Sequence, residues 1–76
     1  MRTIEEVMSS VFGVERETID ESSSPQSVEG WDSMGHVNLI TALEQAFNVS
    51  IDIDDVMEMG DVRKIRQILL GYGVKG

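Results

Sequence analysis

The chain has 76 residues, a length that suits one small domain with a single modest core. Hydrophobic residues make up 41% of it and aromatic residues only 5%, so we expect a folded domain with a largely aliphatic interior. The formal net charge of −8 argues against binding to nucleic acid or anionic membranes and favours basic protein surfaces as partners. The sequence has no cysteine, which excludes a disulfide framework, a thiol nucleophile and a cysteine-based metal site.

The distribution of apolar residues bears on targeting. Glu5 and Glu6 interrupt the apolar residues that follow Met1, which is unlike the apolar core of a secretory signal peptide. No apolar stretch is long enough to span a bilayer. We therefore expect a soluble, cytoplasmic domain, and we expect it to be a monomer.

The N-terminal segment has the pattern of a capped helix. Thr3 and Glu6 have the spacing of a capping box, in which each side chain binds the other residue's backbone N–H. Apolar residues then follow at helical spacing, namely Ile4, Val7, Met8, Val11 and Phe12. Because Gly13 is a typical residue for a helix end, the pattern predicts a first helix between Thr3 and Gly13.

Residues 14–31 show no sustained period, and Ser22–Ser27 has the composition of turns. A loop of this length is uncommon inside a compact domain and is often functional. Three spaced apolar residues, Val14, Ile19 and Val28, are expected to attach it to the core.

A long helix is predicted to begin at Ser33 and to end near Asn48, after about four turns. Its apolar residues lie at helical spacing on one stripe, Met34, Val37, Ile40, Leu43 and Phe47, which is widened by Leu39, Ala42 and Ala46.

Two more helices are predicted after a short extended connector at Ser50–Ile51. Asp52 or Asp54 can cap a helix of about two turns that ends at Gly60. Its apolar residues are Val56, Met57 and Met59. Asp61 can cap a last helix that ends at Gly71. Its inward-facing residues are Val62, Ile65, Ile68 and Leu69.

These elements predict an all-α fold, a small four-helix bundle with three longer helices, one short third helix and a long first loop. We expect residues 1–71 to form the helical domain and residues 72–76 to form a flexible C-terminal tail.

The junction at Asp32–Ser33, between the loop and the longest predicted helix, is the most informative point of the sequence. A serine in the first turn of a helix lies among backbone N–H groups that have no intrahelical acceptor. Those groups and the helix dipole favour an anion, so a phosphate esterified to the Ser33 hydroxyl would be well placed. Asp and Ser are also common N-cap residues, and taken alone this pair is explained by capping.

The residues around this junction resemble an acyl carrier protein. The segment Trp31-Asp32-Ser33-Met34-Gly35-His36-Val37 is followed by Leu39-Ile40, Leu43-Glu44 and Phe47, and the order of helices and loops agrees over nearly the whole chain. In that family a serine carries a 4′-phosphopantetheine arm, which a magnesium-dependent phosphopantetheinyl transferase transfers from coenzyme A. The thiol of the arm holds acyl or aminoacyl groups as thioesters. The resemblance implies that Ser33 is the attachment residue, that Asp32 and Met34 serve the transferase, and that the domain is not an enzyme.

The resemblance also implies a cargo site and a partner surface. Cargo would lie between the second and third helices against six apolar residues, Val37, Ile40, Leu43, Ile51, Val56 and Met59, although we favour a plain core role for Leu43 and Ile51. Enzymes with basic docking patches, which load or transfer acyl or aminoacyl groups, would contact residues on the outer faces of those helices: Gly35, His36, Asn38, Thr41, Glu44, Asp55 and Glu58.

The sequence departs from the family pattern on the helix that follows Ser33. Many fatty-acid carriers have acidic residues at the positions of Gly35 and Asn38 and a methionine at that of Thr41, so we expect weak service to housekeeping fatty-acid synthase enzymes. Asp-Ser-Met-Gly is similar to the motif of D-alanyl carrier proteins. Trp31 and His36-Val37-Asn38-Leu39 are similar to stand-alone carriers of specialised biosynthesis, including polyketide biosynthesis. We expect a specialised acyl carrier, with a D-alanyl or other aminoacyl (peptidyl) carrier as the alternative.

Three functions of other classes compete with this one. A Ser33–His36 hydrolase lacks an oxyanion-hole motif, and a lone exposed histidine explains His36 better. A calcium-binding EF-hand loop starting at Asp52 fails because Met57 and Arg63 stand where glycine and glutamate are required, so no metal site is predicted. An acidic helical adaptor without a prosthetic group stays open, because only Arg16 opposes a dozen acidic side chains over residues 15–61.

Overall fold

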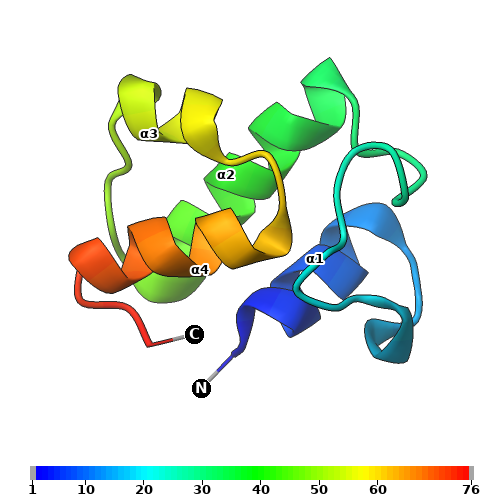
Figure 1. The fold of residues 1–76 in the computed structure, drawn as a ribbon. Helices are drawn as coiled ribbons and strands as arrows, with labels where there is room; N and C mark the ends of the chain where they lie inside the picture. The colour runs from blue at the N-terminus through cyan, green and yellow to red at the C-terminus, as the bar shows by residue number, and fades with distance from the viewer. Residues whose placement is uncertain (1, 76) are drawn as a thin grey trace.

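The computed structural model describes residues 2–75 as four α-helices and one short 3-10 helix, with no strand in that range (Figure 1). In chain order they are α1 (Ile4–Phe12), η1 (Arg16–Thr18), α2 (Ser33–Phe47), α3 (Ile53–Glu58) and α4 (Val62–Gly71). The predicted all-α fold, with three longer helices, a short third helix and a long first loop, is confirmed. None of the helices within residues 2–75 is both long and apolar enough to cross a membrane.

Side-chain caps fix where the three longer helices begin. Thr3 and Glu6 form the predicted capping box at the start of α1. Asp32 and Asp61 each accept a backbone N–H from the first turn of α2 and of α4. At the other end of α2, Asn48 adopts a left-handed conformation with φ of 55°. These helix starts, and the end of α2, agree with the sequence prediction.

The core lies between α1, α2 and α4, each of which buries an aliphatic stripe. The buried residues of these stripes are Ile4, Val7, Met8, Leu39, Ile40, Leu43, Val62, Ile65 and Leu69. The long loop reaches the same core through buried Ile19 and Val28 and partly buried Val14, as predicted. Trp31, at the end of the loop, is also buried, and its ring stacks on Phe12 with 5.9 Å between ring centroids.

The short helix α3 lies at the edge of the molecule and differs from the other three (Figure 1). It has no buried residue, and Ile53 and Met57 are 70% and 80% exposed. Asp52 precedes it without a side-chain cap hydrogen bond. The helix ends at Glu58 rather than at the predicted Gly60, and Met59 is buried in the core.

Residues 72–75, the described part of the predicted tail 72–76, contact the rest of the domain. Val74 is buried in the core. The Tyr72 hydroxyl accepts the backbone N–H of Asp52 at 2.9 Å and donates to the Asp55 carboxylate at 2.6 Å. The domain boundary at residue 71 and the flexibility of the tail stay predictions. Met1 and Gly76, at the outer ends of the two predicted segments, lie outside the described residues.

Candidate functional site

The start of α2 presents a serine hydroxyl to solvent. Ser33 is the first residue of the helix and is exposed, and Met34 beside it is 73% exposed. Asp32 Oδ1 accepts the Gly35 N–H at 2.8 Å, and the His36 N–H donates to the Asp32 carbonyl at 2.7 Å. The N–H groups of Ser33 and Met34 therefore belong to the first turn, where the helix offers them no acceptor. Such N–H groups and the helix dipole suit a phosphate esterified to the serine hydroxyl.

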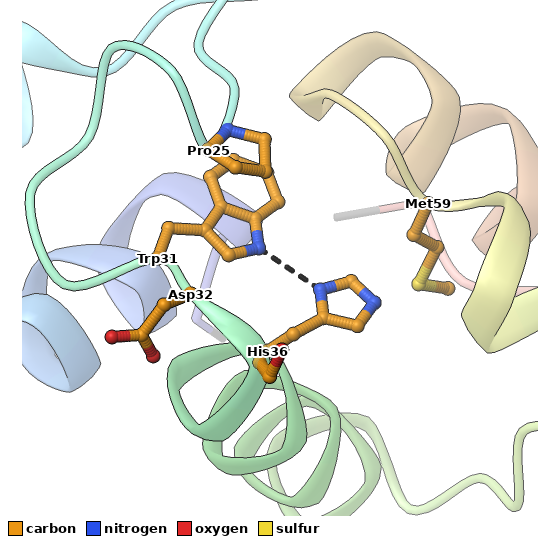
Figure 2. Close-up of a pocket in the computed structure, with 6 residues that line it drawn as sticks. Pro25, Trp31, Asp32, His36 and Met59 are labelled. Carbon is orange, nitrogen blue, oxygen red and sulfur yellow. Dashed lines mark hydrogen bonds between the residues drawn. The ribbon is translucent and has the colours of Figure 1, made fainter.

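Ser33 also lines a cavity of about 470 Å³, which we call the serine cavity. Its other lining residues come from the long loop, the start of α2 and the segment after α3, and they are Pro25, Trp31, Asp32, His36 and Met59. Figure 2 shows the Trp31 indole beside the His36 ring and Met59 pointing toward that ring from the facing segment. The Asp32 carboxylate points away from both (Figure 2). The cavity therefore has one hydroxyl at its edge and largely apolar walls.

His36 is half-buried, and the expectation of an exposed partner-surface histidine is wrong. Its Nδ1 accepts the Trp31 indole N–H at 2.9 Å, and its Nε2 lies 2.8 Å from the Val56 carbonyl oxygen. An indole N–H only donates and a carbonyl oxygen only accepts, so the ring is neutral with its proton on Nε2. Neither nitrogen is free to take a proton from Ser33, which removes the hydrolase alternative.

Gly35 is buried as well, and its predicted place on the partner surface is also wrong. A Cβ atom at Gly35 would lie 1.9 Å from the Gly30 carbonyl oxygen and 3.1 Å from the Phe12 ring. The loop backbone therefore passes against the first turn of α2 at a distance that only glycine permits. An acidic residue cannot be placed at this position without moving the loop.

A second cavity, of about 240 Å³, lies between α2 and α3, and we call it the interhelix cavity. It is lined by Val37, Ile40, Thr41, Ile51, Ile53 and Val56. Four of these, Val37, Ile40, Ile51 and Val56, are among the six residues predicted to shelter cargo. Of the other two predicted residues, Leu43 is fully buried in the core and Met59 lines the serine cavity. Ile53 is absent from the prediction, and its aliphatic side chain at the first position of α3 was the available signal.

The remaining residues predicted for the partner surface divide into two groups. The exposed ones are Asn38, Thr41 and Glu58. Glu44 and Asp55 are half-buried, and both are bonded within the domain. Glu44 Oε2 accepts the Ile51 N–H at 2.8 Å, and Asp55 accepts the Tyr72 hydroxyl. Part of the acidity expected to face a partner is therefore used to hold the residues around α3. Over residues 2–75, His, Asp and Glu side chains form no group of three or more that could hold a metal ion.

Comparison with known proteins identifies the kind of domain. A family model described as a phosphopantetheine attachment site matches residues 2–69, a range that includes α1, α2, α3, most of α4 and both cavities. No curated protein matches the chain. Domains of this family carry covalent 4′-phosphopantetheine and are carriers rather than catalysts. They interact with a phosphopantetheinyl transferase and with the enzymes that use the loaded arm. The chain belongs to the phosphopantetheine attachment site family and is a carrier domain.

Proposed function

We propose that Ser33 carries the 4′-phosphopantetheine arm and that the domain delivers aliphatic acyl groups, as thioesters, to enzymes of fatty-acid-like or specialised biosynthesis. The position of Ser33 supports this assignment, because its exposed hydroxyl begins α2 beside N–H groups suited to a phosphate. The loop serines differ in this respect. The Ser22 hydroxyl donates to Asp20, and the Ser27 hydroxyl donates to the Ser24 carbonyl.

The interhelix cavity is the observation that carries the choice of cargo. Five of its six lining residues are aliphatic, and the sixth, Thr41, donates its hydroxyl to the Val37 carbonyl at 3.1 Å. Each methylene group of an alkyl chain buried there gains about 0.8 kcal/mol. The ammonium group of an aminoacyl cargo would lose its hydration without meeting a carboxylate among the lining residues, which is costly.

Two alternatives from the sequence fare differently. The D-alanyl or other aminoacyl (peptidyl) carrier keeps its support from the segment Asp32–Gly35, because a small cargo can stay outside the cavity. The acidic adaptor without a prosthetic group loses its support, because the family carries a covalent arm.

Loading of the arm tests the attachment residue. The apo protein is incubated with coenzyme A, magnesium and a broad-specificity phosphopantetheinyl transferase, and the intact mass is measured. We expect the mass to increase by one phosphopantetheinyl group in wild type and in the control Ser50→Ala, which changes another exposed serine. Ser33→Ala should gain nothing while keeping its helical circular dichroism. Modification of Ser33→Ala, or no modification of wild type by several transferases, would contradict the proposal.

Thermal melting of loaded forms tests the cargo. The domain is loaded with hexanoyl-phosphopantetheine or with D-alanyl-phosphopantetheine from the matching coenzyme A thioesters. We expect the hexanoyl form to melt at a higher temperature than the holo form, because the chain leaves water, and the D-alanyl form to melt with the holo form. Equal protection by D-alanine would favour the aminoacyl alternative.

A substitution on the outer face of α2 tests which enzymes the domain serves. Because Asn38 and Thr41 are exposed and uncharged, we propose that this domain serves housekeeping fatty-acid synthase enzymes weakly. Opposed charges govern encounter rate and specificity more than affinity. Asn38→Glu should therefore speed malonyl transfer from those enzymes at low salt, and Asn38→Gln should not. The idea fails if wild type already matches a housekeeping carrier, or if the two variants behave alike.

A further inference from the structure

His36 joins three parts of the molecule that lie apart in the sequence. It projects from the first turns of α2 and binds Trp31, at the end of the long loop, through Nδ1. Through Nε2 it binds the carbonyl of Val56, which lies 20 residues later in α3. Because one partner only donates and the other only accepts, both bonds exist together in a single neutral tautomer.

The bond to Val56 matters more to α3 than one hydrogen bond would to a longer helix. The last carbonyls of a helix lack intrahelical donors, and the Val56 carbonyl otherwise receives only the Met59 N–H, at 3.3 Å. Within α3 no residue is buried, and apart from partly buried Val56 and the buried Met59 that follows the helix, little apolar packing holds it against the core. His36 therefore supplies an attachment that the other helices obtain from burial.

The same bond lies where the two cavities approach each other. His36 lines the serine cavity, and its hydrogen-bond partner Val56 lines the interhelix cavity. Figure 2 shows the His36 ring reaching from α2 toward the segment that carries Met59. Because Val56 is both a partner in this bond and a wall of the interhelix cavity, the bond fixes the position of that wall relative to α2.

The other attachment of α3 is at its N-terminal end. Tyr72 binds the Asp52 N–H and the Asp55 carboxylate, and neither contact involves His36. Opening the His36–Val56 bond would therefore let the Val56 side of α3 move away from α2, between the Tyr72 contacts at the N-terminal end and the buried Met59 that follows the C-terminal end. The helix would shift rather than detach.

We propose that His36 is a latch that determines the length of acyl chain this domain shelters. The proposal rests on the proposed function of Ser33 and concerns the same site. With the latch closed, the interhelix cavity keeps its volume of about 240 Å³ and takes short aliphatic acyl groups. A longer linear chain needs more space, which this cavity gains when the bond opens and Val56 moves away from α2.

A chain-length series tests the latch. Wild type and variants are loaded from acetyl-, butyryl-, hexanoyl-, octanoyl- and decanoyl-coenzyme A, and intact mass verifies each loading. The melting temperature of every acyl form is then compared with that of its own holo form. His36→Ala removes both hydrogen bonds. His36→Gln is the matched control, because its amide N–H₂ can still donate to the Val56 carbonyl.

In wild type we expect the rise in melting temperature to stop at a short chain, because further methylenes find no space. In His36→Ala the rise should continue to longer chains, whereas His36→Gln should stop where wild type stops. Backbone amides of α3 should exchange with solvent about fivefold faster in His36→Ala, the effect of losing a hydrogen bond of ordinary net strength. His36→Gln should change that exchange rate little.

His36→Ala leaves the buried indole N–H of Trp31 without an acceptor, and such a loss can unfold a small domain. The double variant Trp31→Phe/His36→Ala removes donor and acceptor together and replaces it in the series if the single variant does not fold. In this double variant too, we expect the rise in melting temperature to continue to longer acyl chains. Equal chain-length profiles in wild type and the alanine variants, or a His36→Gln profile like that of alanine, would overturn the latch.

The protonation of the ring gives a test that needs no arm. Nitrogen NMR of the histidine side chain in the apo protein at neutral pH should show Nε2–H and an unprotonated Nδ1. A proton on Nδ1 would overturn the latch while leaving the attachment at Ser33 untouched. Conversely, failure of wild type to accept any phosphopantetheinyl group would overturn the proposed function while the NMR result stands.

Discussion

The helices α1, α2 and α4 are held by burial, whereas α3 has no buried residue and depends more on two side chains that reach it from other segments. Each of the first three buries aliphatic residues in one core, and α3 has no buried residue. Besides the packing of Val56 and the buried Met59 that follows the helix, its attachments are the His36 bond to Val56 and the Tyr72 bonds to Asp52 and Asp55. Elements with few buried contacts open locally at a lower free energy than the whole domain unfolds.

The difference fits a carrier, which must keep a constant body while its cargo changes. A helix with no buried residue can shift with little exposure of the core. The serine at the start of α2 lies on the side that stays fixed, because Asp32 caps the helix and Gly35 packs against the loop. One wall of the interhelix cavity lies on the side without buried residues, since Ile53 and Val56 belong to α3.

Truncating one aliphatic residue in α2 and one in α3 should give the largest difference in the free energy of unfolding. Leu43→Ala in α2 removes a fully buried side chain, and we expect the free energy of unfolding to fall by about 2–5 kcal/mol. Ile53→Ala in α3 changes a residue that is 70% exposed, so the loss should stay within about 0.5 kcal/mol. Urea unfolding of the apo proteins, followed by circular dichroism, measures both. Similar losses would mean that α3 belongs to the same cooperative core.

Gly35→Ala should be the next most damaging change, although the sequence favours placing this residue at the surface. Its Cβ would meet the Gly30 carbonyl at 1.9 Å, so the loop or the first turn of α2 must shift, at a cost of about 1–3 kcal/mol. Gly71→Ala is the matched control, because it lies in α4 with nothing within 4 Å of the added atom. We expect the control to be neutral or slightly stabilising. A neutral Gly35→Ala would show that the close contact is relieved without cost.

The features that the sequence predicted correctly depend on neighbours within about one turn. The side chains of Thr3 and Glu6 each accept the other residue's backbone N–H at the start of α1. The Asp32 and Asp61 side chains each accept the backbone N–H of the third residue after them. Helical spacing of apolar residues located most of the core for the same reason, since each stripe is a property of one segment. Met34 and Val37, at the start of the predicted α2 stripe, are instead 73% and 59% exposed. Ser33 could be singled out because the residues around it form a contiguous pattern.

The features that the sequence missed depend on contacts between distant segments. Gly35 is buried because the Gly30 backbone passes over it. The spacing of apolar residues in a helix does not indicate where a loop crosses that helix. His36 and Tyr72 reach backbone groups of α3 and of the residue before it. Because nearly every residue type has the same backbone groups, the sequence does not reveal these contacts. Such contacts help to attach α3, so the sequence indicated residues on both sides of the interhelix cavity without showing how one side is held.

Loss of the capping box should have an intermediate effect on stability. It should act on α1, one of the three helices held by burial. The Thr3 hydroxyl accepts the Glu6 N–H at 3.1 Å, and Thr3→Ala should cost about 0.5–2 kcal/mol. Ser10→Ala, which changes an exposed residue of the same helix, should cost little. Because α1 is part of the core, we expect Thr3→Ala to lower the melting temperature without a separate loosening of α3. Equal effects of the two variants would mean that the cap contributes nothing measurable.

The capping box also predicts an acid dependence. The hydrogen bond from the Thr3 N–H lowers the pKa of Glu6 below its ordinary value of 4.5. A carboxylate with a lowered pKa in the folded state stabilises the domain above the ordinary value and loses that contribution as the pH falls through the lowered one. Glu6→Gln should therefore show a shallower loss of melting temperature on acidification than wild type. Parallel acid profiles of the two proteins would contradict this role of the carboxylate.

The smallest effect on stability is expected from ionisation of Tyr72, and it should be confined to α3. The hydrogen bond to Asp55 requires the protonated hydroxyl and raises the pKa of Tyr72 above its ordinary value of 10.0. A group whose pKa is raised by folding contributes stability at neutral pH and loses it as the pH rises through the raised value. Alkaline solution should therefore release the N-terminal end of α3 while the core persists.

Two methionines report on the two sides, since Met57 is exposed on α3 and Met8 is fully buried in α1. Their ¹³C-methyl NMR signals are followed from about pH 8 to about pH 11, with tyrosinate absorbance measured in parallel. In wild type the Met57 signal should move as the tyrosine ionises, and the Met8 signal should stay. In Tyr72→Phe neither should move with pH, because the ionising hydroxyl is gone and α3 is already released at this end. If Met8 moves together with Met57, the two regions open as one unit, and α3 is not the independent element on which the latch depends.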